Sequence, residues 1–187
     1  MSLQENITAQ ELSNPTIIDN TYSVLNNRYN NLYQFVMHYN DYIMSAHQYD
    51  DTYTLTMMEV HTLSYIEDHL GTSSGELIQY WDKTKGTISQ ILTRLEKLEL
   101  IEKRKKEGNA KNLYLYVTQE GSRVSKAHKM YNILDITKTM SQLQEKCSAE
   151  EIEAFYHVIF VYNEVIKKDF EINKSSRKRI PAAPAQE

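Results

Sequence analysis

Residues 73–117 read SSGELIQYWDKTKGTISQILTRLEKLELIEKRKKEGNAKNLYLYV. Ser73 precedes Glu76 by three residues, and this capping-box spacing predicts a short helix over 77–81. After a two-residue break, Thr84 is placed to cap a second helix. One apolar stripe runs along this second helix and consists of Ile88, Ile91, Leu92, Leu95 and Leu98. Two short helices joined by a tight turn predict a helix-turn-helix.

The second half of the same stretch predicts a β-hairpin. A basic run over 101–107 leads into the turn signal Gly108-Asn109, and residues 113–117 then alternate with a period of two. A hairpin that directly follows a helix-turn-helix forms a winged helix. We therefore expect a mainly α fold with a small β-hairpin wing.

Long helices are expected on both sides of the winged helix. No proline occurs between Pro15 and Pro181, and all five glycines lie between residues 71 and 121. Because glycine and proline interrupt regular structure, the flanking sequence is typical of long helices. Residues 21–48 also carry apolar side chains at heptad-like spacing, which favours burial against another helix.

The predicted organisation has five segments. They are a partly ordered arm over 1–20, a first dimerisation helix over 21–48, the winged helix-turn-helix over 53–118, C-terminal dimerisation helices over 119–173, and a disordered basic tail over 174–187. A short extra helix is the alternative for residues 1–20. Within the winged helix-turn-helix, Thr56 and Glu59 form another capping-box pattern, and the helix that they begin is expected to end at Gly71.

The long helices at both ends predict a homodimer. Their apolar stripes are too extensive to be buried within one small subunit, so we expect them to pack against the same helices of a second copy. The residues predicted at this interface are Leu25, Leu32, Val36, Ile152, Phe155, Ile159, Tyr162 and Ile166.

Charge is distributed unevenly along the chain of 187 residues. The formal net charge of −4 conceals a sum of −9 over residues 1–81 and of +6 over residues 82–129. A basic block in an acidic protein indicates a face that binds a polyanion, with a merely solvated charged surface as the alternative.

Cysteine content and hydropathy indicate the compartment. A single cysteine, Cys147, excludes an internal disulfide and any multi-cysteine zinc framework. No apolar run approaches the roughly 18 residues that a membrane span requires, and the N-terminus lacks a signal-peptide pattern. We expect a cytoplasmic protein without a membrane partner.

Six short motifs, taken in order, resemble the MarR (multiple antibiotic resistance regulator) family. They are LTMMEVHTL at 55–63, GELI at 75–78, TKGTISQ at 84–90, LEKLELIEK at 95–103, LYVTQEG at 115–121 and SAEE at 148–151. The resemblance implies a homodimeric winged-helix transcriptional regulator, usually a repressor, that binds a pseudo-palindromic operator. In such proteins the helix that corresponds to residues 84–98 enters the major groove of double-stranded DNA, and the wing reaches the minor groove.

The residues themselves support a DNA-binding role for this helix and for the wing. With the apolar stripe facing inward, polar and cationic side chains face outward and can bind phosphates or base edges. Backbone amides at the helix start also suit a phosphate. The predicted DNA contacts are Thr84, Lys85, Gly86, Thr87, Ser89, Gln90, Arg94, Lys103, Arg104, Asn109 and Lys111. For Arg94, an ion pair with Glu96 or a solvated role is an alternative.

The wing departs from the family pattern. Asn109-Ala110-Lys111 stands where most members carry an Asp-x-Arg cluster. Lysine is a weaker minor-groove probe than arginine because its ammonium is more strongly hydrated. We therefore expect weaker wing contacts, partly offset by the cations of residues 103–106 along the phosphates.

No cofactor and no metal site are predicted. His61 and His128 align with positions that zinc-sensing relatives use, but Ile43 and Asn132 stand where further ligands would be needed. Two histidines alone make a weak zinc site, so satisfied interfacial histidines are the favoured interpretation. The resemblance also implies a small-molecule effector that releases the regulator from DNA, whose identity the sequence does not reveal.

Two other classes of protein are the alternatives to a DNA-binding regulator, namely an enzyme and a protein-interaction module. The sequence contains no Gly-rich phosphate loop, no nucleophile elbow and no His-Glu-x-x-His helix, so we do not expect an enzyme. The stronger alternative is a winged-helix module that binds another protein and binds DNA weakly or without specificity. The absent wing arginine and the acidic remainder of the chain favour this alternative.

Overall fold

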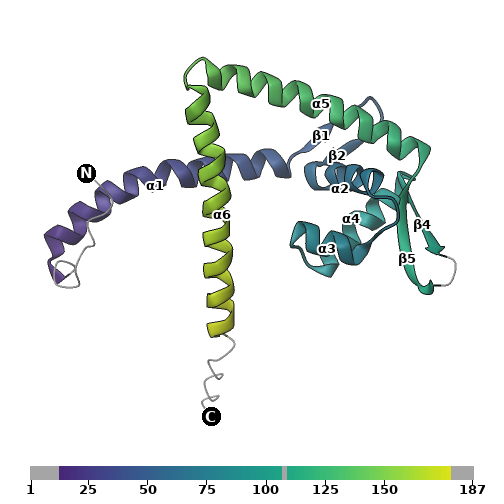
Figure 1. Cartoon of the computed structure of the whole chain (residues 1–187), viewed down its shortest axis with the longest axis horizontal. Helices are drawn as coiled ribbons and strands as arrows, with labels where there is room; N and C mark the ends of the chain where they lie inside the picture. Colours follow the sequence, from purple (N-terminus) through teal and green to yellow (C-terminus); the bar gives the residue numbers. More distant parts are fainter. Residues whose placement is uncertain (1–12, 107–108, 178–187) are drawn as a thin grey trace, which may run out of the picture. The chain divides into compact units, whose positions relative to one another are not determined.

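The computed structural model describes residues 13–106 and 109–177, which form mostly helices with two small antiparallel sheets (Figure 1). The chain divides into two compact units, Met1–Tyr131 and Asn132–Glu187. Within the described residues, no helix combines the length and the apolar character needed to cross a membrane.

The first helix, α1, spans Pro15–Met44 and begins earlier than the sequence predicted. Asn14 caps it by accepting a hydrogen bond from the backbone amide of Thr16 at 3.0 Å. Proline is well tolerated at the first helical position, because the amide it lacks would have no partner there. Residues 15–20 of the expected arm are therefore helical and continuous with α1.

The first helix also ends earlier than expected. Ser45 terminates α1, and its backbone amide donates to the carbonyls of Asp41 and Tyr42. The strand β1 (Ala46–Gln48) follows and pairs antiparallel with β2 (Thr54–Thr56). Three-residue strands are too short to show an alternating pattern, so the sequence had assigned 45–48 to the helix.

The second helix, α2 (Met57–Asp68), begins with the capping box that the sequence predicted. The Thr56 hydroxyl accepts a hydrogen bond from the Glu59 amide at 3.3 Å, and the Glu59 carboxylate accepts one from the Thr56 amide at 2.8 Å. The helix ends before the predicted stop, because His69 caps it and Gly71 then adopts a φ of +79°.

The helix-turn-helix is confirmed by α3 (Ser74–Trp81) and α4 (Lys85–Lys97). The capping box between Ser73 and Glu76 is present at the start of α3. Asp82 closes α3 in the left-handed region, with a φ of +48°. Thr84 caps α4 as predicted.

The wing consists of β4 (Ile101–Lys106) and β5 (Asn109–Val117), paired antiparallel. Of the predicted turn, Gly108 lies outside the described residues, whereas Asn109 already belongs to β5. A third strand, β3 (Thr72–Ser73), joins the sheet in the order β3-β5-β4. Two residues leave no periodic signal, so the sequence did not predict β3.

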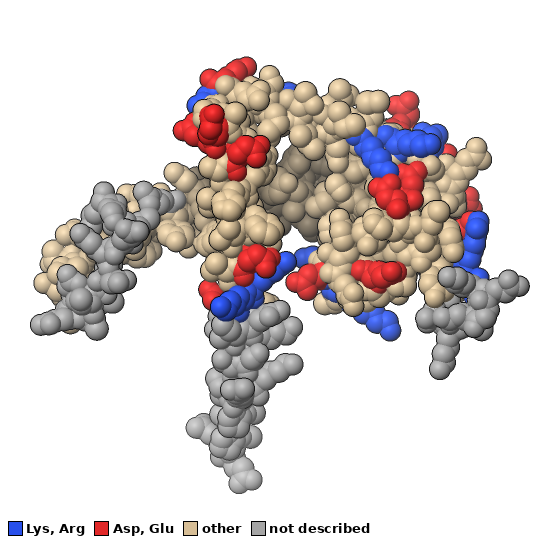
Figure 2. Space-filling view, in the orientation of Figure 1, with Lys and Arg blue, Asp and Glu red and all other residues tan. Residues whose placement is uncertain are grey.

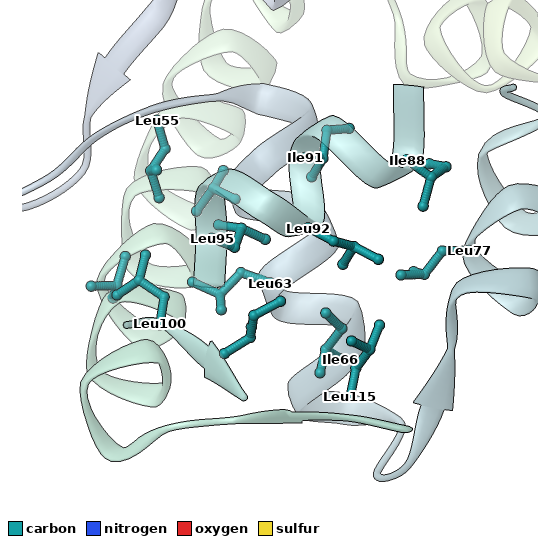
Figure 3. Close-up of a cluster of buried hydrophobic side chains, with 13 residues drawn as sticks. Leu55, Leu63, Ile66, Leu77, Ile88, Ile91, Leu92, Leu95, Leu100 and Leu115 are labelled. Atoms are coloured by element: carbon teal, nitrogen blue, oxygen red, sulfur yellow. The ribbon is translucent and has the colours of Figure 1, made fainter. Parts of the chain in front are cut away.

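One apolar core holds α2, α3, α4 and the wing together (Figure 3). The predicted inward stripe of α4 is confirmed, with Leu98 only partly buried. The core residues are Leu55, Val60, Leu63, Ile66, Leu77, Ile88, Ile91, Leu92, Leu95, Leu100, Ile101, Leu115 and Val124.

The last two helices are α5 (Gln119–Gln144) and α6 (Ala149–Arg177). A capping box at the start of α6 joins Ser148 and Glu151, as the sequence predicted. The helix continues to Arg177, so the boundary at 173 was placed too early. The rest of the predicted tail lies outside the described residues.

Candidate DNA-binding surface

The candidate surface begins with the N-terminal half of α4. Burial of the apolar stripe leaves Lys85, Ser89 and Gln90 exposed on the opposite side of the helix. These three side chains supply one cation and two hydrogen-bonding groups, which suits phosphates and base edges. The structure thus places them together, as the sequence predicted.

Thr84 and Thr87, both predicted to contact DNA, also form the cap at the start of α4. The Thr84 hydroxyl accepts a hydrogen bond from the Thr87 amide at 3.2 Å, and the two hydroxyls lie 3.0 Å apart. Thr87 is half-buried, so its side chain is less available than the sequence implied.

Gly86 is not required by packing. A Cβ built at this position would meet only the Thr84 hydroxyl, at the ordinary contact distance of 3.7 Å. The absence of a side chain here therefore leaves the backbone at the helix start open to a close ligand, without serving the fold.

Arg94 differs most from the sequence expectation. Its Nε forms an ion pair with Glu59 Oε1 at 2.8 Å, and its Nη2 donates to the Thr54 carbonyl at 3.2 Å. The alternative partner considered for Arg94 was Glu96, but Glu96 instead pairs with Lys103. Arg94 is therefore engaged by α2 and β2, although 54% of its side-chain surface stays exposed.

The described cations of the wing are partly neutralised by nearby acids. Lys103 Nζ lies 2.5 Å from Glu96 Oε2, and Arg104 forms an ion pair with Glu102. The Arg104 guanidinium also lies over the Tyr116 ring, 5.0 Å from its centre. The side chains of Asn109 and Lys111 lie outside the described residues.

Within α3, α4, β4 and the turns between them, four lysines with described side chains have no ion pair to another described residue. They are Lys83, Lys85, Lys97 and Lys105, and all are exposed. Figure 2 shows blue Lys or Arg side chains along the edge where Figure 1 draws β4 and β5. Lys83 and Lys97 are not among the predicted DNA contacts, although their positions beside the apolar stripe of α4 could have suggested them.

His61 and His128 meet in the structure, as a pair of packed rings. Their ring centres lie 4.5 Å apart at an interplanar angle of 75°. His128 is 2% exposed, its Nδ1 lies 3.3 Å from the Ser64 hydroxyl, and its buried Nε2 has no hydrogen-bond partner. Burial, with smaller effects of His61 and Lys129, lowers the pKa of His128 to about 4. Burial also lowers the pKa of His61.

No metal centre forms around this pair within the described residues, because no group of three or more His, Cys, Asp or Glu side chains is placed to hold an ion. The sequence favoured satisfied interfacial histidines for this pair. His128 does not fit that description, because it is buried within the chain and its Nε2 has no hydrogen-bond partner among the described residues.

Comparison with known proteins shows which protein family the winged helix resembles. Residues 53–111 match the family model of the MarR family. The winged helix is a MarR-family domain. A curated relative from Bacillus subtilis (strain 168), the uncharacterized HTH-type transcriptional regulator YhjH, is 30% identical over 78 residues. This match covers 42% of the chain and less than half, 45%, of the relative.

Solved MarR-family structures extend the likeness to more of the chain. Streptococcus pneumoniae FabT in complex with DNA matches with a TM-score of 0.57 and 18% identity, over 79% of this chain and 98% of that chain. The zinc-responsive family member ZitR from Lactococcus lactis matches with a TM-score of 0.59 and 16% identity, over 76% and 99% of the two chains. At such identities the likeness concerns the fold.

Proposed function

We propose that the protein is a sequence-specific DNA-binding regulator, a repressor that binds a pseudo-palindromic operator as a homodimer. The observation that carries this proposal is the two-faced helix α4, whose apolar side is built into the core while its opposite side presents Lys85, Ser89 and Gln90 to solvent. FabT and ZitR, which share the fold, were both solved in complex with DNA.

The chemistry of α4 assigns separate tasks to its residues. The exposed amides at the helix start and the Lys85 ammonium suit a phosphate, which would fix the register of the helix on the duplex. Gln90 offers an amide that can pair with the major-groove edge of adenine. Lys83, Lys97 and Lys105 add non-specific attraction to the backbone.

The homodimer is supported by the exposed apolar side chains of α1 and α6, each considered by itself. Of the predicted interface, Val36, Phe155, Ile159, Tyr162 and Ile166 are exposed in the single chain, and Leu25 and Leu32 are half-buried. Ile152 is only 8% exposed and thus already covered within the chain, so it is a poor candidate for an intermolecular contact. Large exposed apolar faces of this kind mark interaction sites.

Release by an unidentified small-molecule effector and location in the cytoplasm complete the proposal. Both follow from the role of a regulator that must meet chromosomal DNA and respond to a signal.

Binding to DNA beside the protein's own gene tests the proposal. A labelled duplex of that intergenic sequence and a scrambled duplex of equal length would be titrated by fluorescence anisotropy at 50 and 200 mM salt. We expect the native duplex to bind at least about 10³-fold more tightly than the scrambled one. A dimer with roughly 6 to 10 phosphate contacts should lose about 10³- to 10⁵-fold in affinity between the two salt concentrations.

Two variants test which residues of α4 contact base edges and which contact phosphates. Gln90→Ala should reduce discrimination between the duplexes, whereas Lys85→Ala should weaken both and flatten the salt dependence. Lys168→Ala, on an exposed position of α6, is the matched control and should change neither. Equal affinity of the wild type for both duplexes would overturn the proposal.

The same titration separates a second candidate function, a winged-helix module for protein interaction. The pairing of Lys103 with Glu96 and of Arg104 with Glu102 favours it, because these cations are partly neutralised before any DNA arrives. Such a module would show weak, salt-sensitive binding without discrimination.

A further inference from the structure

Arg94 joins three segments that lie far apart in the sequence. It belongs to α4, it pairs with Glu59 in the first turn of α2 at 2.8 Å, and it donates to the Thr54 carbonyl of β2 at 3.2 Å. The two contacts use different nitrogens of one planar guanidinium, so they fix the direction of the side chain as well as its position.

Both carboxylate oxygens of Glu59 have a partner. Its Oε2 accepts the Thr56 amide at 2.8 Å as part of the α2 capping box, and its Oε1 receives Arg94. The residue is only 7% exposed. A carboxylate removed from water in this way requires a charged or hydrogen-bonding partner, and Arg94 supplies the charge.

We propose that Arg94 is a positioning residue for DNA binding: it holds α4 on α2 and β2 instead of binding the nucleic acid. This inference rests on the proposed function and revises the predicted role of Arg94 as a DNA contact. A helix that reads base edges depends on its orientation, because a displacement of about 1 Å already breaks hydrogen-bond geometry.

The proposal predicts an effect of Glu59 that has the opposite sign from simple electrostatics. Glu59→Gln removes a negative charge, so long-range attraction to DNA alone would strengthen binding. If Glu59 holds the residue that orients α4, the same substitution weakens specific binding. Glu153→Gln is the matched control, because it removes the same charge at an exposed position of α6.

Specific affinity and its salt dependence form the first arm of the test. We expect Glu59→Gln, Arg94→Gln and Arg94→Lys each to lower affinity for the native duplex by roughly 3- to 10-fold, with little change for the scrambled duplex. The slope of log affinity against log salt should stay that of the wild type, because no phosphate contact is lost. Glu153→Gln should stay within about twofold of the wild type.

Thermal unfolding without DNA forms the second arm. The single variants Glu59→Gln and Arg94→Gln and the double variant would be compared in a double-mutant cycle. We expect the double variant to unfold at a temperature close to that of the more destabilised single variant, because each substitution removes the same pair.

Three outcomes would overturn the inference. The first is strictly additive effects in the cycle. The second is a flatter salt slope for Arg94→Gln combined with unchanged binding by Glu59→Gln, because this pair of results makes Arg94 a phosphate contact. The third is tighter binding by Glu59→Gln. Failure of the proposed function looks different, since wild-type protein would then bind both duplexes equally, whatever the cycle shows.

Discussion

At the scale of single residues, two glycines in helices have opposite roles. Gly121 lies in the first turn of α5, where a Cβ would fall 1.9 Å from the Leu100 carbonyl oxygen and 2.8 Å from Val117. The backbone of the loop that leads into the wing therefore approaches the helix more closely than any side chain permits. At Gly86, by contrast, the space beside the helix is open.

We predict that Gly121→Ala destabilises the protein by about 1–3 kcal/mol, because the backbone of Leu100 must move to accommodate the methyl group. Gly86→Ala should instead raise the free energy of unfolding by about 0.5–1 kcal/mol through helix propensity. Urea denaturation of both variants measures the difference. Equal effects of the two substitutions would contradict the packing argument.

His128 predicts a loss of stability in acid. Its pKa is about 4 in the folded chain against an ordinary value of 6.5, so the unfolded state binds more protons between these limits. The contribution of His128 to the free energy of unfolding is therefore fully present above about pH 6.5. It is lost as the pH falls towards about 4, by up to about 3 kcal/mol at roughly 1.4 kcal/mol per pKa unit. His61 acts in the same direction.

Urea denaturation between pH 7 and pH 4 tests this prediction. His128→Leu should show a shallower decline than the wild type over this range, because the buried imidazole no longer has to stay neutral. Acidic side chains with a lowered pKa, such as Glu67, contribute equally to both proteins and cancel in the comparison. If the free energy of unfolding fell with pH equally in both proteins, the predicted contribution of His128 would be contradicted.

At the scale of elements, local chemistry decided which parts the sequence could predict. Each capping box joins residues three apart, so Thr56, Ser73 and Ser148 marked the starts of three helices correctly. The strands β1, β2 and β3 depend on pairing between separate segments and are only two or three residues long. They are therefore too short for an alternating sequence pattern to predict them.

The same reasoning explains the candidate surface. The outward face of α4 was predictable, because the apolar stripe fixes which side of one helix is buried. The role of Arg94 was not, because its partners Thr54 and Glu59 come 40 and 35 positions earlier in the chain. Sequence spacing within α4 could suggest only a neighbour on that helix.

The two glutamates that form ion pairs with the cations of β4 lead to a further prediction. Glu96 and Glu102 each neutralise one cation of β4, so the double substitution Glu96→Gln with Glu102→Gln should free Lys103 and Arg104. We expect tighter binding to the native and the scrambled duplex alike, with a steeper salt dependence, by up to about 2 in slope per subunit. Glu153→Gln with Glu164→Gln on α6 serves as the charge-matched control. An equal gain in the control would show that net charge alone explains the effect.

At the scale of the whole molecule, α6 exposes more apolar surface than a solvated helix tolerates. Its exposed apolar side chains are Phe155, Tyr156, Val158, Ile159, Phe160, Val161, Tyr162, Val165, Ile166 and Phe170. At 100° per residue they cover well over half of the helix circumference, and the polar side chains Glu153, His157, Glu164 and Lys168 occupy the remaining face. A helix of this kind needs partners on more than one side, and the proposed homodimer would supply them from a second copy of the chain.

Ile159→Asp tests the dimer, because Ile159 lies in the middle of this apolar arc and is 42% exposed in the single chain. Burying a carboxylate there would cost several kcal/mol, so we expect light scattering to show a monomer where the wild type is a dimer. Ile159 does not belong to the apolar core of the winged helix, so the winged helix should stay folded in this variant. The monomer should bind a half-site with about half the salt slope of the dimer. Glu164→Asp on the polar face is the control and should remain dimeric. A wild-type protein that is monomeric at micromolar concentration would contradict the dimer outright, and it would leave the apolar arc of α6 to a different partner.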